Sequence, residues 1–263
     1  MRYFPRRCDK WLAILLLAVG HAAFAGLPDI IDQVRPAVVG VGTTYPARQP
    51  VGKARPNNLL GTGFVVDDGY TVVTNYHVLP RELDHTNNQS LAVFSGRGKE
   101  ARIHLAELLE QDSLHDLALL RITSGPLASM ALGDSDKVRE GDLVAFTGFP
   151  IGAVLGLFPV THTGIVSSIT PVVRTADSAG QLSSAQLLRM RNPFDVFQLD
   201  AVAYPGNSGS PVFHPETGKV IGVVNSVFVK ESREAILERP SGITYAVPVR
   251  HVKELLRRAA ERN

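Results

Sequence analysis

Short apolar runs rich in β-branched residues recur along most of this chain, and Gly, Pro, Asn or Asp residues bound them. Strands spaced by about ten residues, with turn residues between them, are typical of all-β sandwiches and barrels. Long helical segments do not alternate with these runs, which argues against a parallel α/β sheet. The runs that predict strands are Val38–Val41, Gly63–Val66, Thr71–Thr74, Leu91–Phe94, Leu117–Ile122, Leu143–Thr147, Val160–Ile169, Val196–Leu199, Pro211–Phe213, Val220–Val227 and Ile243–Val247.

A clear helical period closes the chain. Apolar residues from Val252 to Ala259 fall on one helical face, and basic residues lie away from it. The spacing predicts a helix over about 249–262, whose basic side is more simply a solvated face than a nucleic-acid site. The stretch Ser124–Asp136 contains none of these apolar runs and separates two strand-rich halves. We therefore predict an N-terminal barrel over about 36–125 and a C-terminal barrel over about 138–248.

The first 25 residues have the pattern of a secretory signal peptide. Basic residues precede an apolar run, Trp11–Val19, and Ala23-Phe24-Ala25 then supplies small residues before Gly26. The run is too short to span a bilayer, so we expect cleavage after Ala25 and a periplasmic or secreted mature chain. The Arg6-Arg7 pair leaves general secretion and twin-arginine export open, with ordinary basic charge favoured. The single cysteine, Cys8, lies in this segment, so no thiol chemistry is expected in the mature chain.

The composition is that of a globular protein of one or two domains, with 263 residues, 44% of them apolar and 20% charged. The net charge of +2 disappears once residues 1–25 are set aside, because the basic residues are concentrated there. No basic excess remains to bind nucleic acid or an anionic membrane surface. The histidines also lack the paired spacing of metal ligands, so we predict no metal and no other cofactor.

Candidate chemistry begins with a serine held between glycines, in the segment Pro205–Pro211. A tight turn can expose the Ser208 hydroxyl, and the backbone N–H groups of Gly206 and Ser208 can point together at an oxyanion, with Asn207 between them. A glycine-serine turn alone also fits an ordinary surface loop.

Two further residues give this serine a possible catalytic role. His77 follows a predicted strand, and Asp116 immediately precedes another, where its carboxylate would be desolvated and would need a partner. A serine hydroxyl becomes a nucleophile when a base within hydrogen-bond reach accepts its proton, and a buried carboxylate can orient that base. His115 is the weaker candidate for the base, because neighbouring residues on a strand point to opposite sides.

Several motifs, in the same order along the chain, resemble the protease domain of the HtrA (Deg) serine proteases. The resemblance extends from about Val38 to Leu256. It is carried by Gly61-Thr62-Gly63-Phe64, Thr74-Asn75-Tyr76-His77-Val78, Asp116-Leu117-Ala118-Leu119-Leu120, Leu132-Gly133-Asp134-Ser135, Gly148-Phe149-Pro150, Thr163-Gly164-Ile165-Val166-Ser167, Gln198-Leu199-Asp200-Ala201, Gly206-Asn207-Ser208-Gly209 and Gly242-Ile243-Thr244-Tyr245-Ala246-Val247-Pro248.

The resemblance implies a chymotrypsin-like fold of two six-stranded antiparallel barrels, with a trypsin-like serine protease domain over 26–263. It implies His77 as general base, Asp116 as its orienting partner and Ser208 as nucleophile. Residues Thr170–Phe197 and Phe228–Ser241 match loops that order the active site in the family. Two departures are Ser210, where the family has a second glycine, and Tyr76 before the histidine. We also expect no PDZ domain in this chain.

The predicted substrate pocket is apolar. Val202 lies six residues before Ser208, at the position of the pocket base, where trypsin-like cleavage would require an acidic residue. Val223, Val224 and Asn225 are predicted to line the walls. We therefore expect cleavage after small or medium aliphatic residues.

The sequence thus predicts a serine endopeptidase of the cell envelope that cleaves misfolded or exported proteins through an acyl-enzyme on Ser208. The alternative is a silent peptide-binding or chaperone-like protein that uses the same cleft. An adaptor working through the terminal helix is a third, weaker alternative. Unfolded or extended polypeptides are the expected partners. A homotrimer through the apolar residues of 27–34 is also possible, although these residues could instead cap the first barrel.

Overall fold

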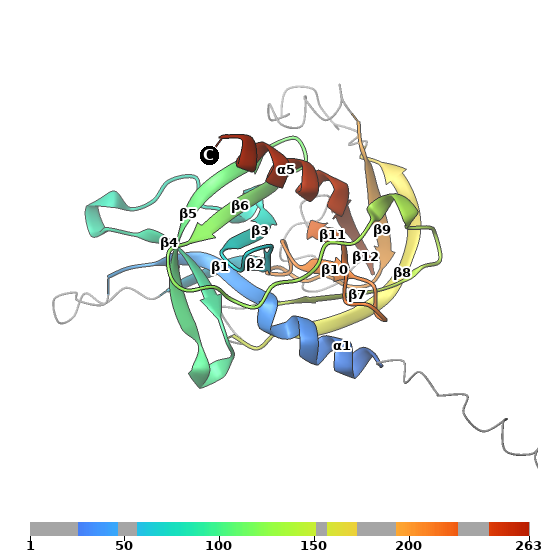
Figure 1. Cartoon of the computed structure of the whole chain (residues 1–263), viewed down its shortest axis with the longest axis horizontal. Coiled ribbons are helices and arrows are strands. Elements are labelled where there is room, and N and C mark those ends of the chain that lie inside the picture. Colours follow the sequence, from blue (N-terminus) through green and yellow to red (C-terminus); the bar gives the residue numbers. More distant parts are fainter. Residues whose placement is uncertain (1–25, 47–56, 151–156, 173–192, 226–241, 263) are drawn as a thin grey trace, which may run out of the picture.

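The computed structural model describes residues 26–46, 57–150, 157–172, 193–225 and 242–262. Two closed antiparallel barrels, each of six strands, make up most of this part (Figure 1). The predicted all-β fold with a C-terminal helix is confirmed. The predicted signal peptide, most of Thr170–Phe197 and all of Phe228–Ser241 lie outside the described residues.

The first barrel has the strand order β1-β2-β3-β6-β5-β4 and the second has the order β10-β11-β12-β9-β8-β7. The strands of the first barrel are β1 (Val38–Thr44), β2 (Asn58–Val66), β3 (Thr71–Asn75), β4 (Ser90–Ser95), β5 (Arg102–Asp112) and β6 (Leu117–Ile122). Those of the second are β7 (Leu143–Gly148), β8 (Val160–Pro171), β9 (Asp195–Asp200), β10 (Pro211–Phe213), β11 (Val220–Asn225) and β12 (Ile243–Pro248). The helices are α1 (Leu27–Val34) and α5 (Val249–Arg262), with short 3-10 turns η1 (Arg35–Ala37), η2 (Tyr76–Val78), η3 (His85–Asn87), η4 (Gly98–Glu100) and η5 (Ser135–Lys137).

One strand, β5, was not among the apolar runs that predicted strands. Its exposed positions carry Ile103, Leu105 and Leu108, whereas His104 and Glu110 are buried. The usual alternation of apolar inside and polar outside is therefore largely reversed, and a register shift between Leu108 and Glu110 breaks it further. Pairing with β4 and β6 on both sides stabilises the strand in spite of this pattern.

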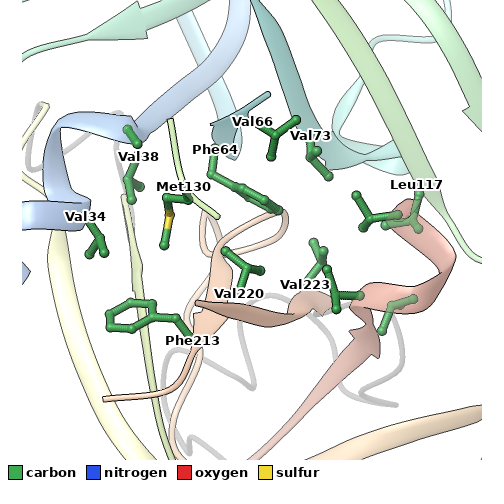
Figure 2. Close-up of a cluster of buried hydrophobic side chains, with 14 of the residues drawn as sticks. Val34, Val38, Phe64, Val66, Val73, Leu117, Met130, Phe213, Val220 and Val223 are labelled. Atoms are coloured by element: carbon green, nitrogen blue, oxygen red, sulfur yellow. The ribbon is translucent and has the colours of Figure 1, made fainter. Parts of the chain in front are cut away.

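A shared apolar cluster joins the two barrels. Figure 2 shows Phe64 and Val73 of the first barrel facing Val220 and Val223 of the second, with Met130 of the connecting segment beside them. Burying such side chains stabilises the fold by about 1.5–3 kcal/mol each. The cluster holds the barrels in one fixed relation, so loops of both barrels can contribute to one site.

The apolar face of α1 packs onto this cluster. Ile30 and Val34 are buried in it, and both lie over the turn at Gly218, which joins β10 to β11. The helix therefore covers part of the second barrel and does not simply cap the first. A trimer through these residues remains a prediction.

The predicted amphipathic helix is present as α5, with Val252, Leu255 and Ala259 buried against both barrels. Several of its basic residues pair with carboxylates. Arg258 Nη2 lies 2.7 Å from Asp112 Oδ2, and Arg257 pairs with Glu254 and Glu261. Because these charges are already compensated, a nucleic-acid role for this face is further disfavoured.

The first turn of α5 makes the fold sensitive to acid. His251 stacks on His115 with ring centroids 3.8 Å apart, and burial, together with the charges of His115 and Arg250, lowers the pKa of His251 to about 3. The unfolded chain takes up this proton near pH 6.5, so stability is lost as the pH falls from about 6.5 toward 3.

His251→Phe keeps the stacked ring and removes the titration. We expect the variant to lose less stability than wild type between about pH 7 and pH 4.5, by on the order of 1 kcal/mol. Urea unfolding at the two pH values measures the difference. His85→Gln, at an exposed histidine of η3, is the control and should follow wild type. Equal acid sensitivity of His251→Phe and wild type would contradict the prediction.

Candidate active site

His77 lies in the short turn η2, directly after β3. The register of β3 with β6 places Asn75 opposite Leu117, so the residue after β3 and the residue before β6 are neighbours. Two further bonds reach the backbone carbonyl of Asp116: Asn75 Nδ2 donates at 3.0 Å and the Tyr76 N–H at 3.1 Å. Strand pairing therefore brings His77 to Asp116.

Asp116 is 3% exposed and its carboxylate accepts from three N–H groups. The His77 backbone N–H donates to Oδ1 at 2.9 Å, and Asn225 Nδ2 donates to Oδ2 at 2.8 Å. The His77 ring nitrogen Nδ1 lies 2.6 Å from Oδ2. An ionised carboxylate only accepts, so Nδ1 carries the proton and Nε2 is left as an acceptor.

Ser208 completes the arrangement from the second barrel. Its Oγ lies 3.0 Å from His77 Nε2, and the residue is 4% exposed, while the His77 side chain is 30% exposed. The structure thus brings Asp116, His77 and Ser208 into one hydrogen-bonded chain. His115 lies elsewhere, because its Nδ1 bonds to Asp112 at 2.9 Å.

The turn that carries Ser208 is held from both barrels. Thr62 of β2 donates its backbone N–H to the Ser208 carbonyl at 2.9 Å and its Oγ1 to the Gly206 carbonyl at 2.7 Å. From the other side, the Gly209 N–H donates to the Val224 carbonyl at 3.0 Å. Gly209 has φ +88°, and a Cβ there would lie 2.0 Å from the Thr62 carbonyl oxygen, so only glycine fits.

Thr62 has a role that was missed from the sequence, where it was noted only as part of a motif. Its hydroxyl accepts the Phe149 N–H at 2.9 Å while it donates to Gly206, so it joins β2, the end of β7 and the serine turn. The sequence signal for this role was the position of Thr62 between two glycines. A glycine at position 61 indicates close packing, because a side chain there would meet Val78 and the Ser208 carbonyl.

Gly148 offers a test of this packing. A Cβ at position 148 would lie 2.0 Å from Ser210 Oγ and 2.8 Å from Asn207 Oδ1, so these two buried side chains of the serine turn would have to move. Because an error of about 1 Å in a catalytic group can cost about 100-fold, we expect Gly148→Ala to lower kcat/KM by about 10- to 100-fold with the fold retained. Peptide hydrolysis and thermal melting measure the two effects.

The double variant Gly148→Ala/Ser210→Gly removes the shorter of these contacts. It should recover part of the activity that Gly148→Ala loses. A single variant as active as wild type would contradict the proposed packing.

The structure corrects part of the predicted pocket. Val202 is half-buried on the segment between β9 and the serine turn. Val223 and Val224 are fully buried, one between the barrels and the other in the core of the second barrel, because successive strand residues face opposite sides. Asn225 is also fully buried and donates to Asp116, so these three side chains do not form the walls of an open pocket.

The described residues contain no group of three or more His, Cys, Asp or Glu side chains placed to hold a metal ion. Within the same ranges, no helix is long and apolar enough to cross a membrane.

Comparison with known proteins agrees with this geometry. The family model of the trypsin-like peptidase domain matches residues 61–223. A probable periplasmic serine endoprotease, DegP-like, from Marinomonas sp. (strain MWYL1) is 30% identical over 94% of this chain and 53% of its own length. Serine protease Do-like HtrA from Bacillus subtilis (strain 168) is 30% identical over 87% of this chain and 47% of its own length. The chain therefore spans about half the length of these relatives.

Solved structures give the same fold. The HtrA-type protease AlgW with a decapeptide has a TM-score of 0.66 at 24% identity, over 90% of this chain and 68% of that one. The same protease with a tripeptide has a TM-score of 0.61 at 25% identity, over 89% of this chain and 63% of that one. The chain belongs to the trypsin-like peptidase family, on its HtrA (Deg) branch.

Proposed function

We propose that this protein is a serine endopeptidase that works through an acyl-enzyme on Ser208. The observation that carries the proposal is the continuous chain from Asp116 Oδ2 to His77 Nδ1, at 2.6 Å, and from His77 Nε2 to Ser208 Oγ, at 3.0 Å. A hydroxyl held against an acceptor nitrogen, with a carboxylate behind it, is the arrangement that activates serine.

The chemistry proceeds in two halves. Ser208 Oγ attacks the carbonyl carbon of the scissile bond as its proton passes to His77 Nε2, and Asp116 stabilises the imidazolium. The tetrahedral intermediate collapses, His77 protonates the leaving amine, and an ester on Ser208 remains. Water then attacks the ester with His77 again as base, which releases the acid and restores the hydroxyl.

The oxyanion hole in this proposal consists of the backbone N–H groups of Gly206 and Ser208, with Asn207 between them. Gly206 has φ +101°, a conformation that glycine adopts readily and that lets the backbone turn sharply before the nucleophile. The bonds from Thr62 to the Gly206 and Ser208 carbonyls restrain the peptide units that directly follow these two donors. Such preorganised donors stabilise the charge that develops in the transition state.

The proposed preference is for a small or medium aliphatic residue before the cleaved bond, because Val202 is uncharged where trypsin-like cleavage would need a carboxylate. One methylene is worth only about 0.8 kcal/mol, so the preference should be broad. A peptide-library cleavage profile tests it, and a profile dominated by Arg or Lys would overturn it.

The proposed setting is the periplasm, with misfolded or exported polypeptides as substrates and a homotrimer as the possible assembly. The signal-like residues 1–25 and the periplasmic relative support the location. The peptides bound to the AlgW structures support an extended polypeptide as ligand. Sedimentation of the purified protein distinguishes a trimer from a monomer.

Labelling with a fluorophosphonate, read by intact mass, tests the proposed activity. A single adduct on wild type and none on Ser208→Ala is expected, because only an activated serine reacts rapidly with this reagent. Absence of any adduct on folded wild type would overturn the proposal and favour the peptide-binding alternative.

A further inference from the structure

A second buried carboxylate, Asp112, lies at the other end of the turn that carries Asp116. It is the last residue of β5, and three residues separate it from Asp116, which precedes β6. Asp112 is 7% exposed. Its Oδ1 accepts the backbone N–H groups of Leu114 and His115, both at 3.0 Å. The carboxylate thus fixes the course of the chain through the turn.

The other oxygen of Asp112 connects the turn to α5. Oδ2 accepts from His115 Nδ1 at 2.9 Å and from Arg258 Nη2, on α5, at 2.7 Å. Burial acts to raise the pKa of Asp112, but the bonds from His115 and Arg258 outweigh it and hold the pKa well below its usual range. Asp112 is therefore a charged group whose buried position depends on these donors.

Asp116 itself is in the left-handed region, with φ +56°, so the conformation of the turn determines the direction of its side chain. Residues other than glycine adopt this conformation uncommonly, and it persists where the surroundings hold it. In this conformation the Asp116 carbonyl accepts from Asn75 and Tyr76, while its carboxylate accepts from His77. The conformation of the turn and the position of the triad carboxylate are thus linked.

A second contact also joins the helix α5 to this turn. His251 stacks on the His115 ring with an interplanar angle of 19°, and Phe194 meets that ring edge-on at 4.5 Å. His251 and Arg258 are seven residues apart, so they lie on one side of the helix. Together they hold the turn from α5, Arg258 through Asp112 and His251 through His115.

We propose that Asp112 and Arg258 are positioning residues for the triad, and that through them the C-terminal helix α5 holds the Asp116 turn in its working conformation. The proposal rests on the proposed serine protease function. Neither residue touches the reacting atoms, since both act through the turn and through Asp116.

Two substitutions test the proposal from opposite ends of the ion pair. Asp112→Asn keeps the size of the side chain but turns an amide N–H toward one of the present donors. Arg258→Gln removes the partner from α5, at a side chain that is 36% exposed and thus less critical for folding. Each should lower kcat by about 10- to 100-fold with KM changed less than about twofold. Arg258→Lys should restore part of the loss.

Arg257→Gln is the matched control. Arg257 is the neighbouring residue on the same helix, and its ion pairs are with Glu254 and Glu261 on α5 itself. This variant should keep the kcat of wild type. It separates the effect of the Asp112 contact from a general loss of positive charge or of helix stability.

The proton between His77 Nδ1 and Asp116 Oδ2 gives a readout that needs no substrate. It should give a downfield proton NMR signal in wild type and Arg257→Gln, and a shifted or broadened signal in Asp112→Asn and Arg258→Gln. The fraction of folded protein, measured by circular dichroism, is used to correct all the rates.

Wild-type kcat in folded Asp112→Asn and Arg258→Gln would overturn the proposal. An activity loss fully explained by unfolding, with the proton signal unchanged in the folded fraction, would overturn it as well. If wild type shows neither peptide hydrolysis nor fluorophosphonate labelling, the proposed function fails. The proton signal then still decides whether Asp112 and Arg258 position Asp116.

Discussion

Replacing Ser208 with alanine is expected to lower kcat for peptide hydrolysis by about 10⁶-fold, because the hydroxyl that His77 would deprotonate is gone. The remaining rate should come from substrate binding and from the backbone donors of the serine turn, which do not need the hydroxyl. KM should change little, since Ser208 Oγ contributes more to the transition state than to the bound substrate. Initial rates with a chromogenic peptide and fluorophosphonate labelling measure the loss.

Ser129→Ala is the control for this variant. It also removes one hydroxyl, but from an exposed position where Oγ bonds only weakly, at 3.3 Å, to the Asp67 carbonyl. Wild-type activity is expected. If Ser208→Ala kept a substantial part of the wild-type rate in a preparation free of other proteases, Ser208 would not be the nucleophile.

Replacing Asp116 with asparagine is expected to lower kcat by about 10⁴-fold. The three bonds to the Asp116 carboxylate described above come from N–H groups, two from His77 and one from Asn225. An amide has one accepting end, so its NH₂ group must face a donor, or His77 must move its proton to Nε2. A ring protonated at Nε2 cannot accept the Ser208 proton. We therefore expect a large loss of kcat, although asparagine and aspartate have nearly the same shape.

The control for Asp116→Asn is Asp68→Asn, at an exposed carboxylate that pairs with Arg121 on the surface. Exposed ion pairs contribute only about 0–1 kcal/mol, so activity and stability should stay close to wild type. The downfield proton signal of His77 should be lost in Asp116→Asn and kept in Asp68→Asn. An active Asp116→Asn with normal folding would mean that His77 does not need the carboxylate for orientation.

Much of the fold and of the site could be predicted from local sequence alone. The strands β3 and β11 were apparent because β-branched runs bounded by turn residues favour strands, and β6 was apparent as a short apolar run. The helix α5 was apparent from the period of its apolar face. His77, Asp116 and Ser208 could be identified because each lies next to a strand or a glycine turn with a local pattern of its own.

Contacts between distant segments could not be predicted in this way, since they depend on how the barrels close and meet. Asn225 and Asp116 are 109 residues apart, and nothing in the sequence near either one indicates that Asn225 supports the triad and not the pocket. Arg258 and Asp112 are 146 residues apart, and Arg258 was assigned to a solvated face. The strand β5 was missed because its pattern of apolar and polar residues is reversed. It forms nevertheless, because it pairs with a neighbouring strand on each side. The sequence determined the elements and the reactive groups by local physical preferences. The tertiary structure decided which buried donor meets which carboxylate, because that depends on packing between segments far apart in the chain.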